Sequence, residues 1–117
     1  MEIVITDPGE LPKILDKVHD KWFDLDKLKT VMARGIVNIP VARKQGDLSE
    51  NSGHKALLSI HNVTKLEIDD PERVGFYDIN EIDFDRVSGC IKITGGIPSE
   101  IRIFVEKFHM SFDSGFA

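Results

Sequence analysis

The segment that most constrains the fold is residues 75–85, where apolar side chains alternate along the chain but change face halfway. Tyr77 and Ile79 fall on one face of an extended strand. Ile82 and Phe84 share a face with each other, but only after the alternation shifts by one residue. A β-bulge provides such a shift by adding one residue to a strand. We therefore expect a strand over residues 76–85 with a bulge near its middle.

The same construction recurs elsewhere in the chain. Residues 62–68 and, more weakly, 24–30 begin with Asn or Asp and continue with apolar residues in a similar arrangement. Asp and Asn side chains can hydrogen-bond the nearby backbone where a strand begins. A further shift of alternation falls between Val105 and Phe108. These breaks predict a sheet that is curved by several bulges.

Apolar alternation predicts further strands at residues 1–6, 26–33, 36–42, 90–94 and 100–113. At 54–69 it predicts either one long strand or two strands joined at Asn62. The strands at 26–33 and 36–42 are expected to pair as a hairpin around Gly35. Pro40 lacks an N–H group, which predicts an edge position or a bulge there. Residues 43–53 are polar or glycine apart from Leu48 and predict a loop.

One helix is predicted, at residues 9–21, because Leu11, Ile14, Leu15 and Val18 have the spacing of one helical face. The expected fold is α+β and mostly β, with this N-terminal helix packed on a curved antiparallel β-meander of about six strands. The length of 117 residues predicts a single domain, 1–117. The helix face should share one core with five residues of the sheet and its junction: Trp22, Phe23, Phe76, Ile79 and Ile82.

Charge and composition narrow the classes of function. The formal net charge of −5 argues against nucleic acid and anionic membrane surfaces as partners. The N-terminal residues lack the basic and apolar regions of a secretory signal, so we expect a cytoplasmic protein. The single cysteine, Cys90, has no second cysteine for an internal disulfide and suits a half-buried strand position.

No motif of established chemistry is found in the sequence. The glycines lack a phosphate-binding context, and the His and acidic residues lack the spacing of a known metal site, so no cofactor or metal is expected. Carboxylates at 78, 81, 83 and 85 are typical of the solvated face of a strand. The candidate functional residues lie at the rim of the expected core: His19, Asp20, Trp22, Asp24, His61, Tyr77 and Asp78.

Three segments carry a resemblance to a protein family. They are the HDxWFD segment at 19–24, the HNV segment at 61–63 and the GFYDINxI segment at 75–82. In these the chain resembles a family of small bacterial and archaeal proteins without an established activity. More distantly, its layout is similar to that of immunity proteins of bacterial toxin systems, although Trp22 follows the His-Asp pair here. That resemblance implies a complex with a basic toxin domain.

Two functions from different classes are expected. The first is a non-enzymatic binding protein, as a monomer or homodimer, whose binding face is either the loop 43–53 or the acidic side of the sheet. The alternative is a small metal-dependent or hydrolytic enzyme that uses His19, Asp20 and Asp24 with a histidine supplied by the fold.

Overall fold

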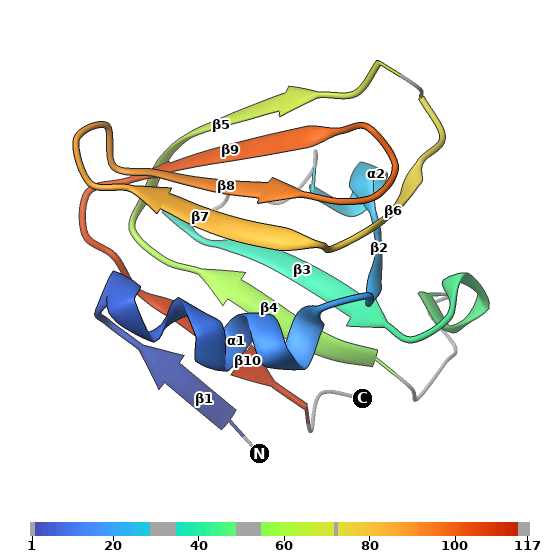
Figure 1. The fold of residues 1–117 in the computed structure, drawn as a ribbon, viewed down its shortest axis with the longest axis horizontal. Helices are drawn as coiled ribbons and strands as arrows, with labels where there is room; N and C mark the ends of the chain where they lie inside the picture. The colour runs from blue at the N-terminus through green and yellow to red at the C-terminus, as the bar shows by residue number, and fades with distance from the viewer. Residues whose placement is uncertain (1, 29–34, 49–54, 72, 115–117) are drawn as a thin grey trace.

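The computed structural model describes residues 2–28, 35–48, 55–71 and 73–114, which form two antiparallel sheets (Figure 1). The six strands of sheet A are, in spatial order, β1 (Glu2–Ile5), β10 (Met110–Asp113), β4 (Lys55–Ile60), β3 (Val37–Ala42), β2 (Trp22–Asp24) and β6 (Phe76–Asp78). The four strands of sheet B are β5 (Val63–Asp69), β9 (Glu100–Val105), β8 (Cys90–Thr94) and β7 (Glu81–Asp85). Neither sheet closes on itself. The antiparallel, mostly-β α+β class is confirmed, but the single meander of about six strands is replaced by two sheets.

The breaks in alternation explain this difference. The chain leaves sheet A for sheet B at Asn62 and again between Asp78 and Glu81, and it returns to sheet A between Val105 and Met110. Asn62 has a φ of 59°, which turns the chain between β4 and β5. Strands that switch sheets form the corners of packed sheets. The shifts predicted as bulges after Ile79 and Val105 are therefore crossings between two sheets. A register shift of the kind that a bulge produces does occur in the β5–β9 pairing, between Val63 and Lys65.

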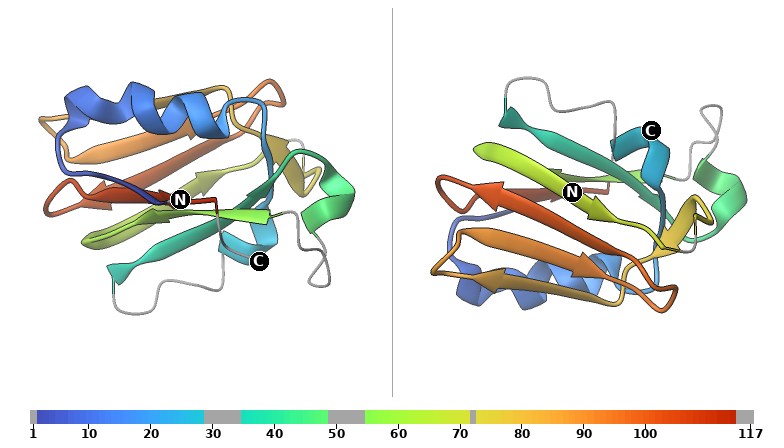
Figure 2. Two further views of the ribbon diagram at one scale, coloured as in Figure 1. Left: turned by 90° about the horizontal axis from the view of Figure 1, so that it is seen from below. Right: turned by 90° about the horizontal axis from the view of Figure 1, so that it is seen from above.

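The helix α1 (Leu11–Val18) follows a turn of 3₁₀ helix, η1 (Pro8–Glu10), and both lie within the predicted range 9–21 apart from Pro8. The Asp7 carboxylate accepts a hydrogen bond from the Gly9 N–H at 2.9 Å and begins this segment. Figures 1 and 2 show α1 lying along β7 and beside β10, so it covers one open side between the sheets. Leu11, Ile14 and Val18 are buried there.

A second helical segment, α2 (Leu25–Leu28), lies where a strand was expected. Leu25 and Leu28 are both buried, and a spacing of three residues puts them on one side of a helical turn but on opposite faces of a strand. Residues 29–33 of the expected strand lie outside the described residues. A short 3₁₀ turn, η3 (Gln45–Leu48), occupies part of the predicted loop 43–53, and residues 49–53 of that loop are also outside the described part.

Among the described residues, β3 pairs with β4 along its whole length and with β2 only at Ala42, while residues 29–33 of its predicted hairpin partner lie outside the described part. At Pro40 the strand therefore has one paired neighbour, β4, opposite Leu57. The absent N–H of Pro40 costs no bond to β2 at that position. Pro40 is thus locally at an edge although β3 is an interior strand of sheet A.

The core lies between the two sheets and contains most of the residues predicted for it. Phe23, Ile79 and Ile82 are buried together with the apolar face of α1, and Leu15 packs against the same cluster. Trp22 and Phe76 are only partly buried and do not belong to it. Each precedes a buried aromatic residue, Phe23 or Tyr77, and neighbours along a strand point to opposite faces. Only one member of each pair can face the core.

Candidate functional site

The predicted rim residues at the end of α1 hold the backbone in place. Asp20 has a φ of 65°, and its N–H donates to the Ile79 carbonyl at 2.8 Å. His19 Nε2 lies 3.0 Å from Asn80 Oδ1, and its Nδ1 lies 3.2 Å from Asp20 Oδ2. These contacts fasten the end of α1 to the crossing between β6 and β7. Both ring nitrogens of His19 are engaged in this structural role.

Asp78 has a similar role toward the turn between β8 and β9. Its carboxylate accepts hydrogen bonds from the Gly96 N–H at 3.0 Å and from the Ile97 N–H at 3.4 Å. A Cβ atom at Gly95 would lie 2.0 Å from the Asp78 carbonyl oxygen, so only glycine fits there. Trp22 pairs across the strands with Asp78, and Asp24 pairs with Phe76, on the outer face of sheet A. Asp78 therefore clamps a tight turn against β6.

Tyr77 is a core residue and not a rim residue. It is fully buried, and its hydroxyl donates to the Asp70 carboxylate and accepts from the Val74 N–H at 3.0 Å. Burial, followed by the hydrogen bond to Asp70, raises the pKa of Tyr77 above its usual value. The hydroxyl stays protonated and ties the segment before β6 to the core.

His61 lies at the other end of sheet A from the remaining rim residues. His61 directly follows Ile60, the last residue of β4. Trp22 pairs with Ala42, which pairs with Lys55, the first residue of β4. The two ends of β4 are roughly 17 Å apart. The His61 ring instead contacts His109, with ring centroids 4.4 Å apart. Burial, and then the charge of His109, lower the pKa of His61, while Glu2 opposes that shift. Among the described residues, the predicted rim does not form one site.

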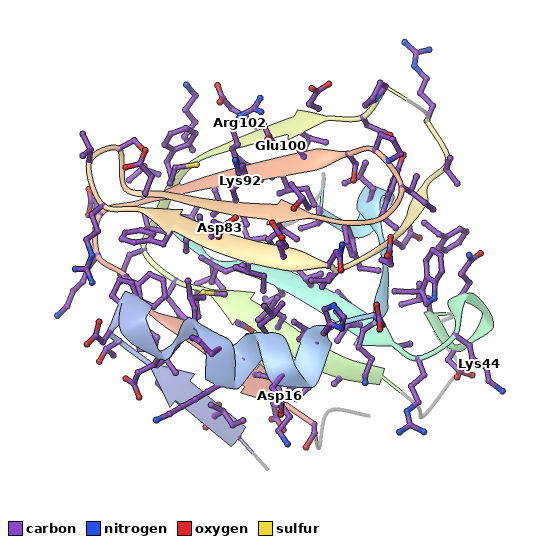
Figure 3. The ribbon with its side chains drawn as sticks, in the orientation of Figure 1. Asp16, Lys44, Asp83, Lys92, Glu100 and Arg102 are labelled. Atoms are coloured by element: carbon purple, nitrogen blue, oxygen red, sulfur yellow. The ribbon has the colours of Figure 1, made fainter. Side chains whose placement is uncertain are left out.

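The outer face of sheet B is a more coherent candidate. Cross-strand pairing sets out three rows of side chains on this face, with Glu67, Arg102, Lys92 and Asp83 in the middle row. One flanking row holds Lys65, Phe104, Cys90 and Asp85, and the other holds Asp69, Glu100, Thr94 and Glu81. Six of these side chains are carboxylates and three are cations. The labelled residues of this face in Figure 3 come from β7, β8 and β9.

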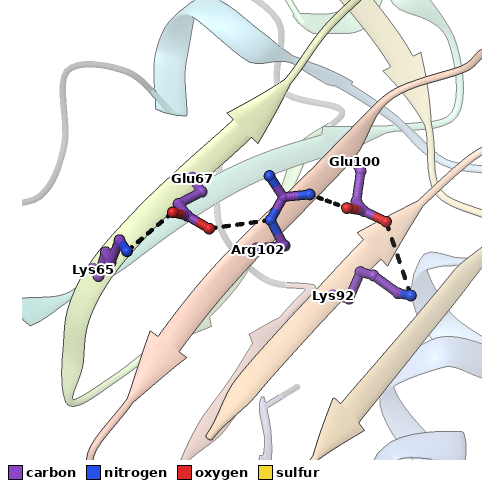
Figure 4. Close-up of polar contacts among 5 residues, drawn as sticks. All are labelled: Lys65, Glu67, Lys92, Glu100 and Arg102. Carbon is purple, nitrogen blue, oxygen red and sulfur yellow. Dashed lines mark hydrogen bonds and ion pairs between the residues drawn. The ribbon is translucent and has the colours of Figure 1, made fainter. Parts of the chain in front are cut away.

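Ion pairs connect the charges at the centre of this face, as Figure 4 shows. Glu67 lies 3.0 Å from Lys65 Nζ and 3.2 Å from Arg102 Nε, while Glu100 pairs with Arg102 and lies 3.8 Å from Lys92 Nζ. Hydrogen bonds from Lys65 and Arg102 lower the pKa of Glu67, and those with Glu67 and Glu100 raise the pKa of Arg102. Each of the three cations, Lys65, Lys92 and Arg102, is therefore paired with at least one of the two carboxylates.

A hollow of about 440 Å³ opens on this face beside the ion pairs. Its lining is Asp83, Phe84, Asp85, Ser88, Cys90, Lys92, Glu100, Arg102 and Phe104. Cys90 and Phe104 lie opposite each other in the strand pairing and give the hollow an apolar part. Burial raises the pKa of the Cys90 thiol, which disfavours the thiolate that nucleophilic chemistry needs. The arrangement suits binding better than covalent catalysis.

The edge of sheet B nearest α1, strand β7, carries carboxylates without a cationic partner among the described residues, and Asp83 is one that lines the hollow. Asp83 and Glu81 are exposed on β7 and have no ion pair within residues 2–28, 35–48, 55–71 and 73–114. Asp85 accepts a hydrogen bond from the Val87 N–H at 2.9 Å, and this bond lowers the pKa of Asp85. A cationic group that approached β7 would therefore meet ionised carboxylates.

The sequence suggested this face only in general terms. Alternation at Glu81, Asp83 and Asp85 indicates one outward face, and the acidic side of the sheet was one of the two expected binding faces. The pairing of β7 with β8, and of β9 with β5, decides which charges meet. No local pattern gives that register, so the hollow and its central ion pairs were missed.

Comparison of the chain with protein-family models, curated proteins and solved structures found no match. Within the described residues, no three or more His, Cys, Asp or Glu side chains are arranged to hold a metal ion. No helix in this part of the chain is long and apolar enough to cross a membrane. The site is therefore interpreted from its own geometry.

Proposed function

We propose that this protein is a non-enzymatic binding protein whose outer face of sheet B binds a basic protein partner. The observation that carries the proposal is the charge on that face, where carboxylates outnumber cations and the cations are already paired. An anionic partner would have to displace Glu67 or Glu100 from Arg102, whereas a cationic partner meets Asp83 and Glu81 directly. Complementary charge guides association and selects among partners.

The immunity-like form of this proposal makes the partner a basic toxin domain encoded by a neighbouring gene. The distant resemblance in layout supports it, together with the acidic face. The hydrolytic alternative gains no support from the geometry of its residues. Both His19 ring nitrogens are occupied by Asn80 and Asp20, and Asp24 lies on the strand β2 that follows.

The test uses labelled basic peptides and two doubly neutralised variants. Glu81→Gln with Asp83→Asn removes charge from the face, while Asp16→Asn with Glu106→Gln removes the same charge from exposed positions on α1 and after β9. Fluorescence anisotropy at low salt should show weaker binding to the first variant by about tenfold and little change for the second. Equal affinities for both variants, or no binding to the unaltered protein, would overturn the proposal.

A further inference from the structure

The hollow on sheet B has a lining that selects a particular side chain. We infer that it receives an arginine side chain of the basic partner, with Asp83 as the carboxylate that pairs with the guanidinium group. This inference rests on the proposed function and adds the position and chemistry of one contact. The charges and the apolar part of the hollow favour arginine as its occupant.

The charges in the lining favour a cation. Arg102 is paired with Glu67 and Glu100, and Lys92 is paired with Glu100, so both cations already have partners. Asp83 lies directly across from Lys92 in the strand pairing, yet the Lys92 ammonium pairs with Glu100. Asp83 remains exposed at the wall of the hollow with no ion pair in the described part of the chain. It is the carboxylate most open to an incoming group.

The rest of the lining favours arginine over lysine. Cys90 and Phe104 offer apolar contacts for the methylene groups of the incoming side chain. A guanidinium group is planar, stacks on aromatic rings and binds carboxylates through two parallel hydrogen bonds. An ammonium group is a strongly hydrated point charge and uses such a lining less well. The mixture of an open carboxylate, an aromatic ring and a thiol therefore fits arginine.

A neighbouring apolar residue indicates that the contact continues beyond the hollow. Val87, at the tip of the β7–β8 hairpin, is 98% exposed and is followed by Ser88, which lines the hollow. Val87 gains nothing from burial within this chain. An apolar residue of the partner, placed next to its arginine, would cover Val87 and remove apolar surface from water.

The experiment compares two short peptides that differ only in one central residue, arginine or lysine. Anisotropy titrations should show tighter binding of the arginine peptide, and Asp83→Asn should weaken that binding by about tenfold or more. Asp16→Asn is the matched control, because it makes the same change at an exposed position on α1, away from sheet B and outside the lining. It should change affinity by roughly twofold or less. Unchanged melting temperatures would show that both variants are folded.

A second readout uses Cys90, the only cysteine of the chain, which lines the hollow. The arginine peptide should slow the reaction of Cys90 with a thiol reagent, and Asp83→Asn should remove that protection. Equal affinities for the arginine and lysine peptides, with Asp83→Asn no worse than Asp16→Asn, would contradict the arginine pocket but not the proposed basic partner. Failure of every basic peptide to bind would overturn the proposed function as well.

Discussion

Two groups of polar side chains in this molecule use their hydrogen bonds differently. At the junction of α1, β2 and β6, the His19 ring contacts the side-chain amide of Asn80. The Asp78 carboxylate accepts a hydrogen bond from the Gly96 N–H in a turn. On the outer face of sheet B, Arg102 pairs with Glu67 across strands β9 and β5 and with Glu100 on its own strand. The first group holds chain segments in place. The second group forms a surface.

This difference shows why the conspicuous motifs did not mark one shared site. The His-Asp and Trp-Phe pairs stand out because they are adjacent in sequence, and adjacency suits the local task of ending a helix and beginning a strand. A binding face on a sheet takes alternate residues from several strands, so its members are far apart in the chain. Four predictions test the contrast, in order of decreasing effect.

The largest effect should separate the two aromatic residues of the junction. Phe23 is 2% exposed and its ring lies 6.2 Å from that of Tyr77, so Phe23→Ala should lower the free energy of unfolding by about 3–5 kcal/mol. Trp22 faces outward and is partly exposed, so Trp22→Ala should cost clearly less. Urea unfolding of both variants gives the comparison. A greater loss for Trp22→Ala would restore the predicted core and contradict the register of β2.

The next effect should distinguish the two acidic residues Asp78 and Asp83. Asp78→Ala leaves the Gly96 and Ile97 amides without their acceptor and should lower the free energy of unfolding by about 1–3 kcal/mol. Asp83→Ala should change stability by about 0.5 kcal/mol or less, because Asp83 is exposed and has no described ion pair. Chemical denaturation measures both. Similar losses would mean that sheet B also depends on its outer carboxylates for folding.

The third effect concerns the pH dependence of stability, which should come from His61, a residue that lies away from the junction. Burial and His109 lower its native pKa below the usual 6.5, so the unfolded chain binds more protons between those two values. The free energy of unfolding should therefore fall as pH falls through that window, by at most about 1.4 kcal/mol per pH unit. His61→Gln should remove this slope. Unfolding curves of both proteins that run parallel from neutral pH to about pH 5 would contradict the assignment.

The smallest effect should come from the centre of the sheet B face. Arg102→Ala breaks its pairs with Glu67 and Glu100, but these side chains are partly exposed to solvent. The loss should be about 1 kcal/mol or less at low salt and should shrink at high salt, because salt screens exposed charges. Thermal melts at two salt concentrations measure this. A large loss that does not depend on salt would make the ion pairs structural, like the contacts of Asp78.

The sequence supports predictions that depend on local spacing. The stripe from Leu11 to Val18 predicted α1, and alternation around Ile39 and Ile91 predicted two strands close to their observed bounds. The single strand predicted at 100–113 is instead two strands, β9 and β10, in different sheets. The shift after Ile79 was visible, but a bulge within one sheet and a crossing between two sheets leave the same pattern. Which one occurs depends on the neighbours of each strand. The hollow depends on those neighbours too, and only the candidate face, not its geometry, could be predicted.

The position of β10 between β1 and β4 has a consequence for synthesis on the ribosome. β1 is synthesised long before β10, which is its one strand partner in sheet A among the described residues. Until then β1 has no strand partner, and the β4 edge that binds β10 stays open to other chains. A chain that stops before Met110 lacks β10, and β1 then has no strand partner among the described residues. Native folding of sheet A must therefore wait until β10 has left the ribosome.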